Sequence, residues 1–119
     1  MRDHLSLTAW QKANQVTRWV LLAGQRNFRP AVRVPFAMLQ QAAIAVQLHI
    51  ARGHALRSTR AFRRHLTLAY ASAVEAHELL RVMDELHLVP SEELAGSLKE
   101  MDEVKGALVA LIRQYRHYR

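Results

Sequence analysis

Hydrophobic residues recur along this chain at intervals of three and four, the spacing that places side chains on one face of an α-helix. No stretch alternates between polar and apolar residues with the period of two that a half-buried strand needs. Glycine and proline, the residues that most often interrupt helices, number only four and three. The pattern therefore predicts an all-α protein, and the chain divides into four helical segments.

The first predicted helix covers residues 6–23 and is followed by a segment that two prolines interrupt. Either Ser6 or Thr8 is expected to be its N-cap, and Gly24 lies near its end. Its inner stripe is irregular and consists of Leu7, Trp10, Thr17, Val20 and Leu21. The following residues 25–35, QRNFRPAVRVP, are predicted to form an irregular basic connector.

The second helix is predicted to begin at Pro35, a favoured first-turn residue, and to end at Gly53. Its main apolar positions follow steps of three and four, namely Phe36, Leu39, Ala43, Val46 and Ile50. Most of the remaining positions are apolar as well, so this helix needs cover on more than one side. We therefore expect copies of the chain to associate through it, with candidate interface residues Phe36, Met38, Ala42, Ala45 and His49.

The third helix is expected to start at a cap formed by Ser58 or Thr59 and to continue to about Leu86. A heptad-like seam with alanine at its centre runs along it, comprising Phe62, Leu66, Ala69, Ala73, Ala76, Leu80 and Met83. Beside the seam, Glu75 is a carboxylate among aliphatic neighbours and is expected to be a buried structural anchor. Its candidate partners are a cation of another chain and Gln40, His49 and Arg52.

The fourth helix is predicted to open at Pro90 and Ser91, with Glu92 and Glu93 in its first turn, where the helix dipole favours acids. Its inner face consists of Leu94, Leu98, Met101, Val104, Leu108, Leu111 and Tyr115. Short connections after the second and third helices favour antiparallel neighbours. Residues 1–119 are thus predicted to form one domain, an antiparallel up-and-down four-helix bundle that assembles into a homo-oligomeric ring.

Positive charge is concentrated in the first two thirds of the chain. The formal net charge is +7, and residues 1–74 contain eleven Arg and Lys side chains against one acid, Asp3. Fourteen of the seventeen cations are arginine, whose forked guanidinium suits phosphate and carboxylate. This distribution indicates an anionic partner, or oppositely charged faces that meet between subunits.

The stretch 52–65, RGHALRSTRAFRRH, contains five arginines and no carboxylate. On a helix, Arg57, Arg60 and Arg64 share one face, which can bind several phosphates without reading a sequence. The same face can equally be solvated or pair with acids of a neighbouring subunit. The candidate nucleic-acid-binding residues are Arg52, Arg57, Arg60, Arg63 and Arg64, with Arg26, Arg29 and Arg33 as a second basic element beside Phe28.

Patterns typical of catalysis and metal binding are missing from the sequence. No cysteine, P-loop pattern or nucleophile elbow occurs, and the seven histidines are scattered. A dimetal bundle site needs two Glu-x-x-His motifs, whereas the nearest approach here is Asp84 with His87. We expect no enzyme activity, no metal and no cofactor. No secretory signal or membrane-length apolar run is recognised, which favours a soluble cytoplasmic protein with no membrane partner.

Three blocks of the sequence resemble a known family: AWQKA at 9–13, QQAAIAVQLHIARG at 40–53 and RSTRAFRRHLTLAYASAVEAHELL at 57–80. The family comprises four-helix bundle proteins related to those encoded in intervening sequences of 23S ribosomal RNA genes. The matching positions are Trp10, Gln11, Ala13, Ala43, Ile50, Ala51, Gly53, Ser58, Phe62, Leu66, Ala69, Ser72 and Glu75. The chain departs from the family pattern at His49, Arg52, Ala61 and His77, and each departure removes an acid or amide or adds a base.

The resemblance implies an all-α bundle that assembles into rings, typically homopentamers, and no enzymatic activity. It also implies distant kinship with bundle proteins that accompany reverse transcriptases in diversity-generating retroelements, whose basic surfaces engage nucleic acid and a polymerase. Taken with the arginine-rich stretch, it predicts an oligomeric accessory or scaffold protein that binds RNA or DNA. The alternative is a protein–protein interaction or assembly module with no nucleic-acid role.

Overall fold

The computed structural model describes residues 4–27 and 29–116 of the chain. A short 3-10 helix, η1 (His4–Ser6), precedes four long α-helices. These are α1 (Thr8–Arg26), α2 (Pro30–Ala55), α3 (Thr59–Glu85) and α4 (Ser91–Gln114). No residue in the described ranges lies in a strand, which confirms the prediction of an all-α fold with four helices.

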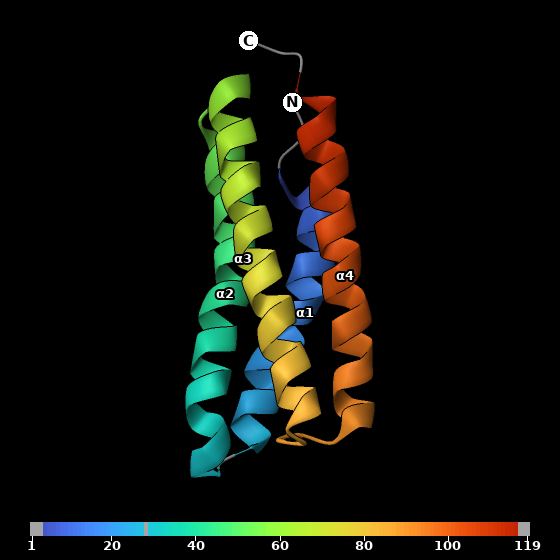
Figure 1. Cartoon of the computed structure of the whole chain (residues 1–119). Helices are drawn as coiled ribbons and strands as arrows, with labels where there is room; N and C mark the ends of the chain where they lie inside the picture. The colour runs from blue at the N-terminus through green and yellow to red at the C-terminus, as the bar shows by residue number, and fades with distance from the viewer. Residues whose placement is uncertain (1–3, 28, 117–119) are drawn as a thin grey trace.

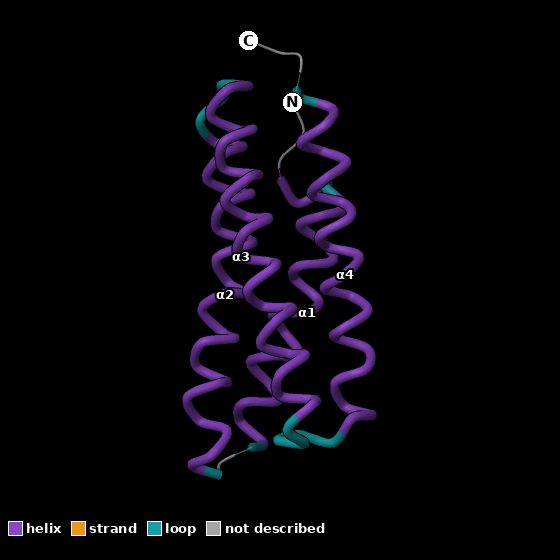
Figure 2. The backbone as a smooth tube through the Cα atoms, in the orientation of Figure 1, coloured by secondary structure: helices purple, strands orange, loops and turns teal. Residues whose placement is uncertain are grey.

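The four helices surround one elongated core. Both α1 and α3 pack against α2 and α4, whereas the diagonal pairs make no close backbone contact within the described residues. The molecule measures 47 × 20 × 20 Å, and short connections join successive helices at alternate ends (Figures 1 and 2). One end, uppermost in Figure 1, therefore brings together η1, the end of α2, the start of α3 and the end of α4. We call it the upper end.

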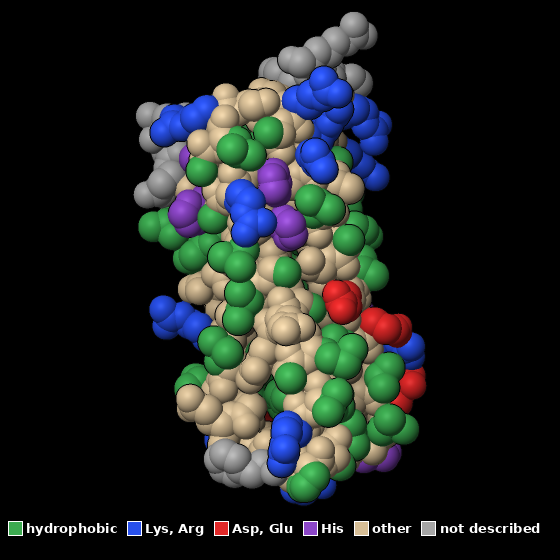
Figure 3. Space-filling model, turned by 90° about the vertical axis from the view of Figure 1, so that its left-hand side faces the viewer, with side chains coloured by type: hydrophobic (Ala, Val, Ile, Leu, Met, Phe, Trp, Pro, Cys, Tyr) green, Lys and Arg blue, Asp and Glu red, His purple; other side chains and the backbone are tan. Residues whose placement is uncertain are grey.

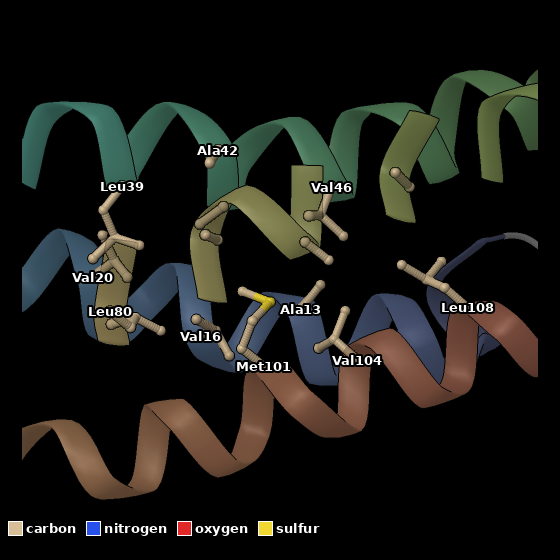
Figure 4. Close-up of a cluster of buried hydrophobic side chains, with 14 of the residues drawn as sticks. Ala13, Val16, Val20, Leu39, Ala42, Val46, Leu80, Met101, Val104 and Leu108 are labelled. Atoms are coloured by element: carbon tan, nitrogen blue, oxygen red, sulfur yellow. The ribbon is translucent and has the colours of Figure 1, made fainter. Parts of the chain in front are cut away.

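Aliphatic side chains from all four helices fill the core (Figure 4). The predicted seam of α3 is confirmed in full, because all seven of its residues are buried. The predicted inner face of α4 is also confirmed, since each of its residues is buried or half-buried. In α1, Leu21 is 40% exposed and was wrongly placed on the inner stripe. Smaller residues such as Ala9, Ala13 and Val16 occupy the inward positions there, where neighbouring helices come closest.

The connector predicted for residues 25–35 is much shorter than expected, because α1 continues to Arg26 and α2 begins at Pro30. Proline at the first position of a helix costs little, since its missing N–H would have no partner there. Pro35 lies inside α2 and removes a single backbone hydrogen bond. Burial of Val32 and Phe36 on either side of it offsets that loss.

Gly53 does not end α2, which continues to Ala55, contrary to the prediction. It lies where α2 passes close to α3. A Cβ atom added at Gly53 would lie 2.6 Å from Cβ of His65 and 3.2 Å from Cδ1 of Phe62. Glycine is therefore needed at this position because it lets the two helices approach closely, and not because it ends α2. The left-handed residue that follows α2 is Arg57, with a φ of 56°.

The outer side of α2 remains apolar in the single chain. Val34, Met38 and Leu48 are 64%, 45% and 51% exposed. By length and composition, α2 is also the one described helix that is apolar enough to cross a membrane, with 33% of the relevant window buried. A core helix of a soluble bundle passes the same test, and α2 packs against α1 and α3. The exposed side chains thus leave an apolar face without a partner inside the described chain.

We expect Gly53→Ala to lower the free energy of unfolding by about 1–3 kcal/mol, because the new methyl group would force α2 and α3 apart. Urea unfolding monitored by circular dichroism measures this change. The matched control is Gly106→Ala in α4, where nothing lies within 4 Å of an added Cβ. That substitution should raise the stability by about 0.5–1 kcal/mol. A Gly53→Ala protein as stable as the unmodified chain would contradict the close approach.

Candidate nucleic-acid interface

Within the described residues, seven arginines from three helices and two turns gather at the upper end of the bundle. They are Arg52, Arg57, Arg60, Arg63, Arg64, Arg113 and Arg116, and we call this group the basic end. Residues 49–74 and 104–116 contain no Asp or Glu that would neutralise it locally. Figure 3 shows Lys and Arg side chains near this end, while the Asp and Glu side chains visible on that face lie lower down.

The members of the basic end differ in their contacts. All of them except Arg63 are exposed. Arg63 is half-buried, and its Nη1 donates a hydrogen bond to the carbonyl oxygen of Arg116 at 2.8 Å. This bond joins the start of α3 to the end of α4. Arg113 and Arg116 belong to the same surface although sequence reasoning did not include them, because only the fold brings α4 beside α3.

The second predicted basic element lies at the opposite end of the bundle. Arg26 is the last residue of α1, Arg29 precedes α2, and Arg33 lies in its first turn. The length of α2 separates them from the basic end by about 35 Å at the helical rise of 1.5 Å per residue. Arg29 Nη2 donates a hydrogen bond to the carbonyl oxygen of Leu88. Phe28, considered for base stacking, lies outside the described residues. The second basic element is therefore separate from the basic end, and it has three arginines against the seven there.

A row of aromatic rings borders the basic end. His4 contacts Trp10 and His54 at centroid distances of 5.5 and 6.4 Å. The row continues from His54 to Phe62 at 5.9 Å and from Phe62 to Tyr115 at 5.2 Å. All four contacts are edge-to-face, the arrangement that the charge distribution of aromatic rings favours. Sequence reasoning missed this row because its members come from five separate segments.

Two adjoining pockets open at the basic end. The ring pocket has a volume of about 260 Å³ and is lined by Gly53, His54, Arg57, Ser58, Thr59, Phe62 and Tyr115. The arginine pocket has a volume of about 270 Å³ and is lined by Leu56, Ser58, Arg60, Ala61, Arg64 and His65. Ser58 lines both, and its hydroxyl oxygen accepts a hydrogen bond from the Ala61 N–H at 3.2 Å, which confirms Ser58 as the cap of α3.

Two histidines bridge α2 and α3 beneath the arginine pocket. The Nδ1 atoms of His49 and His65 lie 3.2 Å apart, so one ring can donate a hydrogen bond to the other only while the acceptor is neutral. Burial lowers the pKa of His49, and the charges of His65 and Arg52 lower it further. Burial, and then the charge of Lys105, lower the pKa of His77 on α3 as well. Both residues thus favour the neutral form.

The predicted interface residues of α2 divide into two groups. Phe36 and Ala42 are each only 3% exposed and belong to the core of the single chain, so their assignment to a subunit interface is wrong. They point inward because they continue the buried stripe of α2. Met38 is 45% exposed, and Ala45 and His49 are half-buried. These three share one outer face of the helix and remain candidates.

Glu75 is exposed, contrary to the prediction of a buried anchor within the chain. The fully buried residues of α3 are those of its seam, whereas Glu75 lies on the neighbouring stripe, where Leu68 and Val82 are exposed as well. Glu75 lines a groove of about 430 Å³ together with Met38, Ala71, Val74, Glu78, Leu79 and Val82. We call this the α2–α3 groove. Its lining is mainly apolar, with two carboxylates.

The described residues contain no group of three or more His, Asp or Glu side chains placed to hold a metal ion. The features assembled at the upper end are cationic, aromatic and hydroxyl-bearing. Such groups bind anions and aromatic rings through charge, stacking and hydrogen bonds.

The chain matches a family model described as 23S rRNA-intervening sequence protein over residues 6–110. A search of curated proteins gives no significant match. The matched range includes α1, α2, α3 and most of α4, and therefore the core and the turn between α2 and α3. Arg113 and Arg116 lie beyond it.

We expect the free energy of unfolding to fall as the pH is lowered through the region below about 6.5, the ordinary pKa of histidine. His49 and His77 have lowered pKa values in the folded chain, so the unfolded chain binds more protons there. Urea unfolding at about pH 7.5 and about pH 5.5 measures the loss, which His49→Asn should reduce. His87→Asn, which changes an exposed histidine far from the pair, is the control. An equal loss in the His49→Asn protein would contradict the assignment.

Proposed function

The chain belongs to the family of 23S rRNA-intervening sequence proteins, and on this basis we propose that it binds nucleic acid, RNA in the first place, through the basic end. In this proposal it acts as a non-enzymatic accessory or scaffold protein of the cytoplasm. Its helices form an antiparallel up-and-down bundle, which the short connections between successive helices support. A polymerase is a candidate protein partner, because the chain is distantly similar to bundle proteins that accompany reverse transcriptases.

The observation that carries the proposal is the gathering of seven arginines at one end, all from the stretches 49–74 and 104–116, which contain no Asp or Glu. Ordinary solvated surfaces interleave the two signs of charge, as the lower half of α3 does, where Arg81 pairs with Glu78 and Glu85. Exposed arginines of the basic end such as Arg60 and Arg64 can instead bind phosphate oxygens in charge-assisted pairs. The affinity that results is dominated by the release of counterions from the nucleic acid and depends steeply on salt.

Assembly into a ring is the second part of the proposal, supported by two exposed apolar faces that carry opposite charges. The α2–α3 groove exposes apolar side chains, with Val74 at 41% and Val82 at 38%, beside Glu75 and Glu78. The outer face of α1 exposes Leu22 at 54% beside Arg18.

An α1 face of one copy seated in the groove of the next would cover both apolar surfaces and pair the arginine with a carboxylate. Such head-to-tail contacts generate closed rings when the rotation between copies closes. That the ring has five subunits is what the resemblance to the family implies.

Binding to a single-stranded RNA 12-mer is expected to weaken by several orders of magnitude between about 50 and 200 mM salt. The double variant Arg60→Glu/Arg64→Glu should abolish binding at the higher salt. The bundle should stay intact because both residues are exposed and an acid in the first turn of α3 suits the helix dipole. Fluorescence anisotropy measures binding, and circular dichroism measures the fold.

The matched control for that variant is Arg26→Glu/Arg33→Glu, which makes the same change of charge at the opposite end of the bundle. It should retain most of the binding. If both double variants lose binding equally, the interaction reflects net charge and the basic end is not the site. If the Arg60→Glu/Arg64→Glu protein dissociates into monomers, these arginines belong to a subunit interface.

The purified protein is expected to be oligomeric by light scattering, and either Leu22→Glu or Val82→Glu should convert it to a monomer. Each substitution places a carboxylate on one side of the same contact, where it would be buried without a partner. Leu56→Glu is the control, because Leu56 is 54% exposed but lies at the upper end. A well-folded monomer of the unmodified chain at micromolar concentration would refute the ring.

A further inference from the structure

We propose that the ring pocket binds one unpaired base of an RNA strand and that the adjoining arginine pocket binds a phosphate of the same strand. This inference rests on the proposed function and specifies the form of nucleic acid that the basic end takes. It predicts a preference for single strands and unpaired ends over continuous duplex.

The ring pocket offers what a base requires. Phe62 forms edge-to-face contacts with both His54 and Tyr115, so three rings line one small recess. Bases stack on such rings with little regard to sequence, because every base has a π-face. The hydroxyl groups of Ser58 and Thr59 can donate to or accept from the polar edge of a base. The volume of about 260 Å³ lies just below the range of about 300–1,000 Å³ typical of drug-sized ligands. It is therefore suited to one ring system.

The arginine pocket explains why the ligand is a strand. It shares Ser58 with the ring pocket and is lined by Arg60 and Arg64, both exposed. A base and its flanking phosphate are neighbouring groups of a polynucleotide, so one nucleotide unit can occupy both pockets at once. The remaining exposed arginines of the basic end then lie beside the path of the strand and can contact further phosphates.

The position of the ring pocket excludes a base that is still paired. The pocket is a recess at the upper end of the bundle, lined by residues of α2, of the turn after it, of α3 and of the end of α4. Bases inside an A-form duplex are stacked and present only their edges in the grooves, whereas loops, bulges and ends can splay a base outward. A duplex can therefore contact the arginines but cannot fill the ring pocket.

Arg57 lines the ring pocket and has a left-handed backbone, with a φ of 56°. This conformation is costly for a residue other than glycine, asparagine or aspartate. Glycine would satisfy the turn without strain, yet the chain has a guanidinium there. A cation held in the lining of the pocket at some cost in stability fits a role in binding an anionic ligand.

The test compares a single-stranded RNA 12-mer, the corresponding 12-bp RNA duplex and adenosine 5′-monophosphate in anisotropy and competition experiments at one salt concentration. The unmodified protein should bind the single strand more tightly than the duplex. Tyr115→Leu, which keeps apolar packing but removes the ring, should weaken single-strand binding about 5- to 100-fold and leave duplex binding unchanged. If the Tyr115→Leu protein folds poorly, His54→Gln removes another ring of the same pocket and should have the same effect.

The matched control is Tyr70→Leu, because Tyr70 is also a half-buried tyrosine packed against the core but lies outside both pockets. It should bind both RNAs as the unmodified protein does. Equal affinity for strand and duplex, or a Tyr115→Leu protein that keeps full single-strand binding, overturns the base pocket while the proposed function stands. If adenosine 5′-monophosphate binds as tightly as the single strand, the ligand of the pocket is a free nucleotide, and the proposal that it is an RNA strand is overturned. Absence of binding to either RNA overturns both proposals.

Discussion

The close approach of α2 and α3 is the constraint on which the rest of the molecule depends. Gly53 lies against His65 and Phe62 with no room for a side chain, and the middle of the α3 seam is alanine. Small residues at such a contact let two backbones pack tightly and bury the larger aliphatic residues on either side. Because the turn between these helices is short, their packing also decides that the cations of both helices share one surface.

The electrostatics of the upper end combine favourable and unfavourable contributions. Cations at the end of α4, such as Arg113, interact well with the negative end of the helix dipole. Arg60 instead lies in the first turn of α3, where the dipole is positive and disfavours it. An anion bound there would remove that repulsion and gain from the same dipole. This relief of repulsion is the physical basis of the proposed interface.

The two proposed binding surfaces are chemically distinct and spatially separate. The basic end is cationic and aromatic, and it is formed where helices meet. The α2–α3 groove lies along the sides of two helices and is apolar with carboxylates at Glu75 and Glu78. Glu75 belongs to the groove because the stripe that carries it faces outward. A protein with this division can assemble through its flank while its end remains open to a charged ligand.

The sequence by itself determined the number and nature of the helices, because the spacing of apolar residues dictates which face of each helix can be buried. It also determined that the stretch from Arg52 to Arg64 is cationic, since composition does not depend on folding. It did not reveal that Pro35 lies inside a helix, that Gly53 is a contact point, or that Glu75 is exposed. Each of these depends on what stands opposite the residue. Only the tertiary structure placed Tyr115 beside Phe62 and Arg116 beside Arg63, because these pairs join segments about fifty residues apart along the chain.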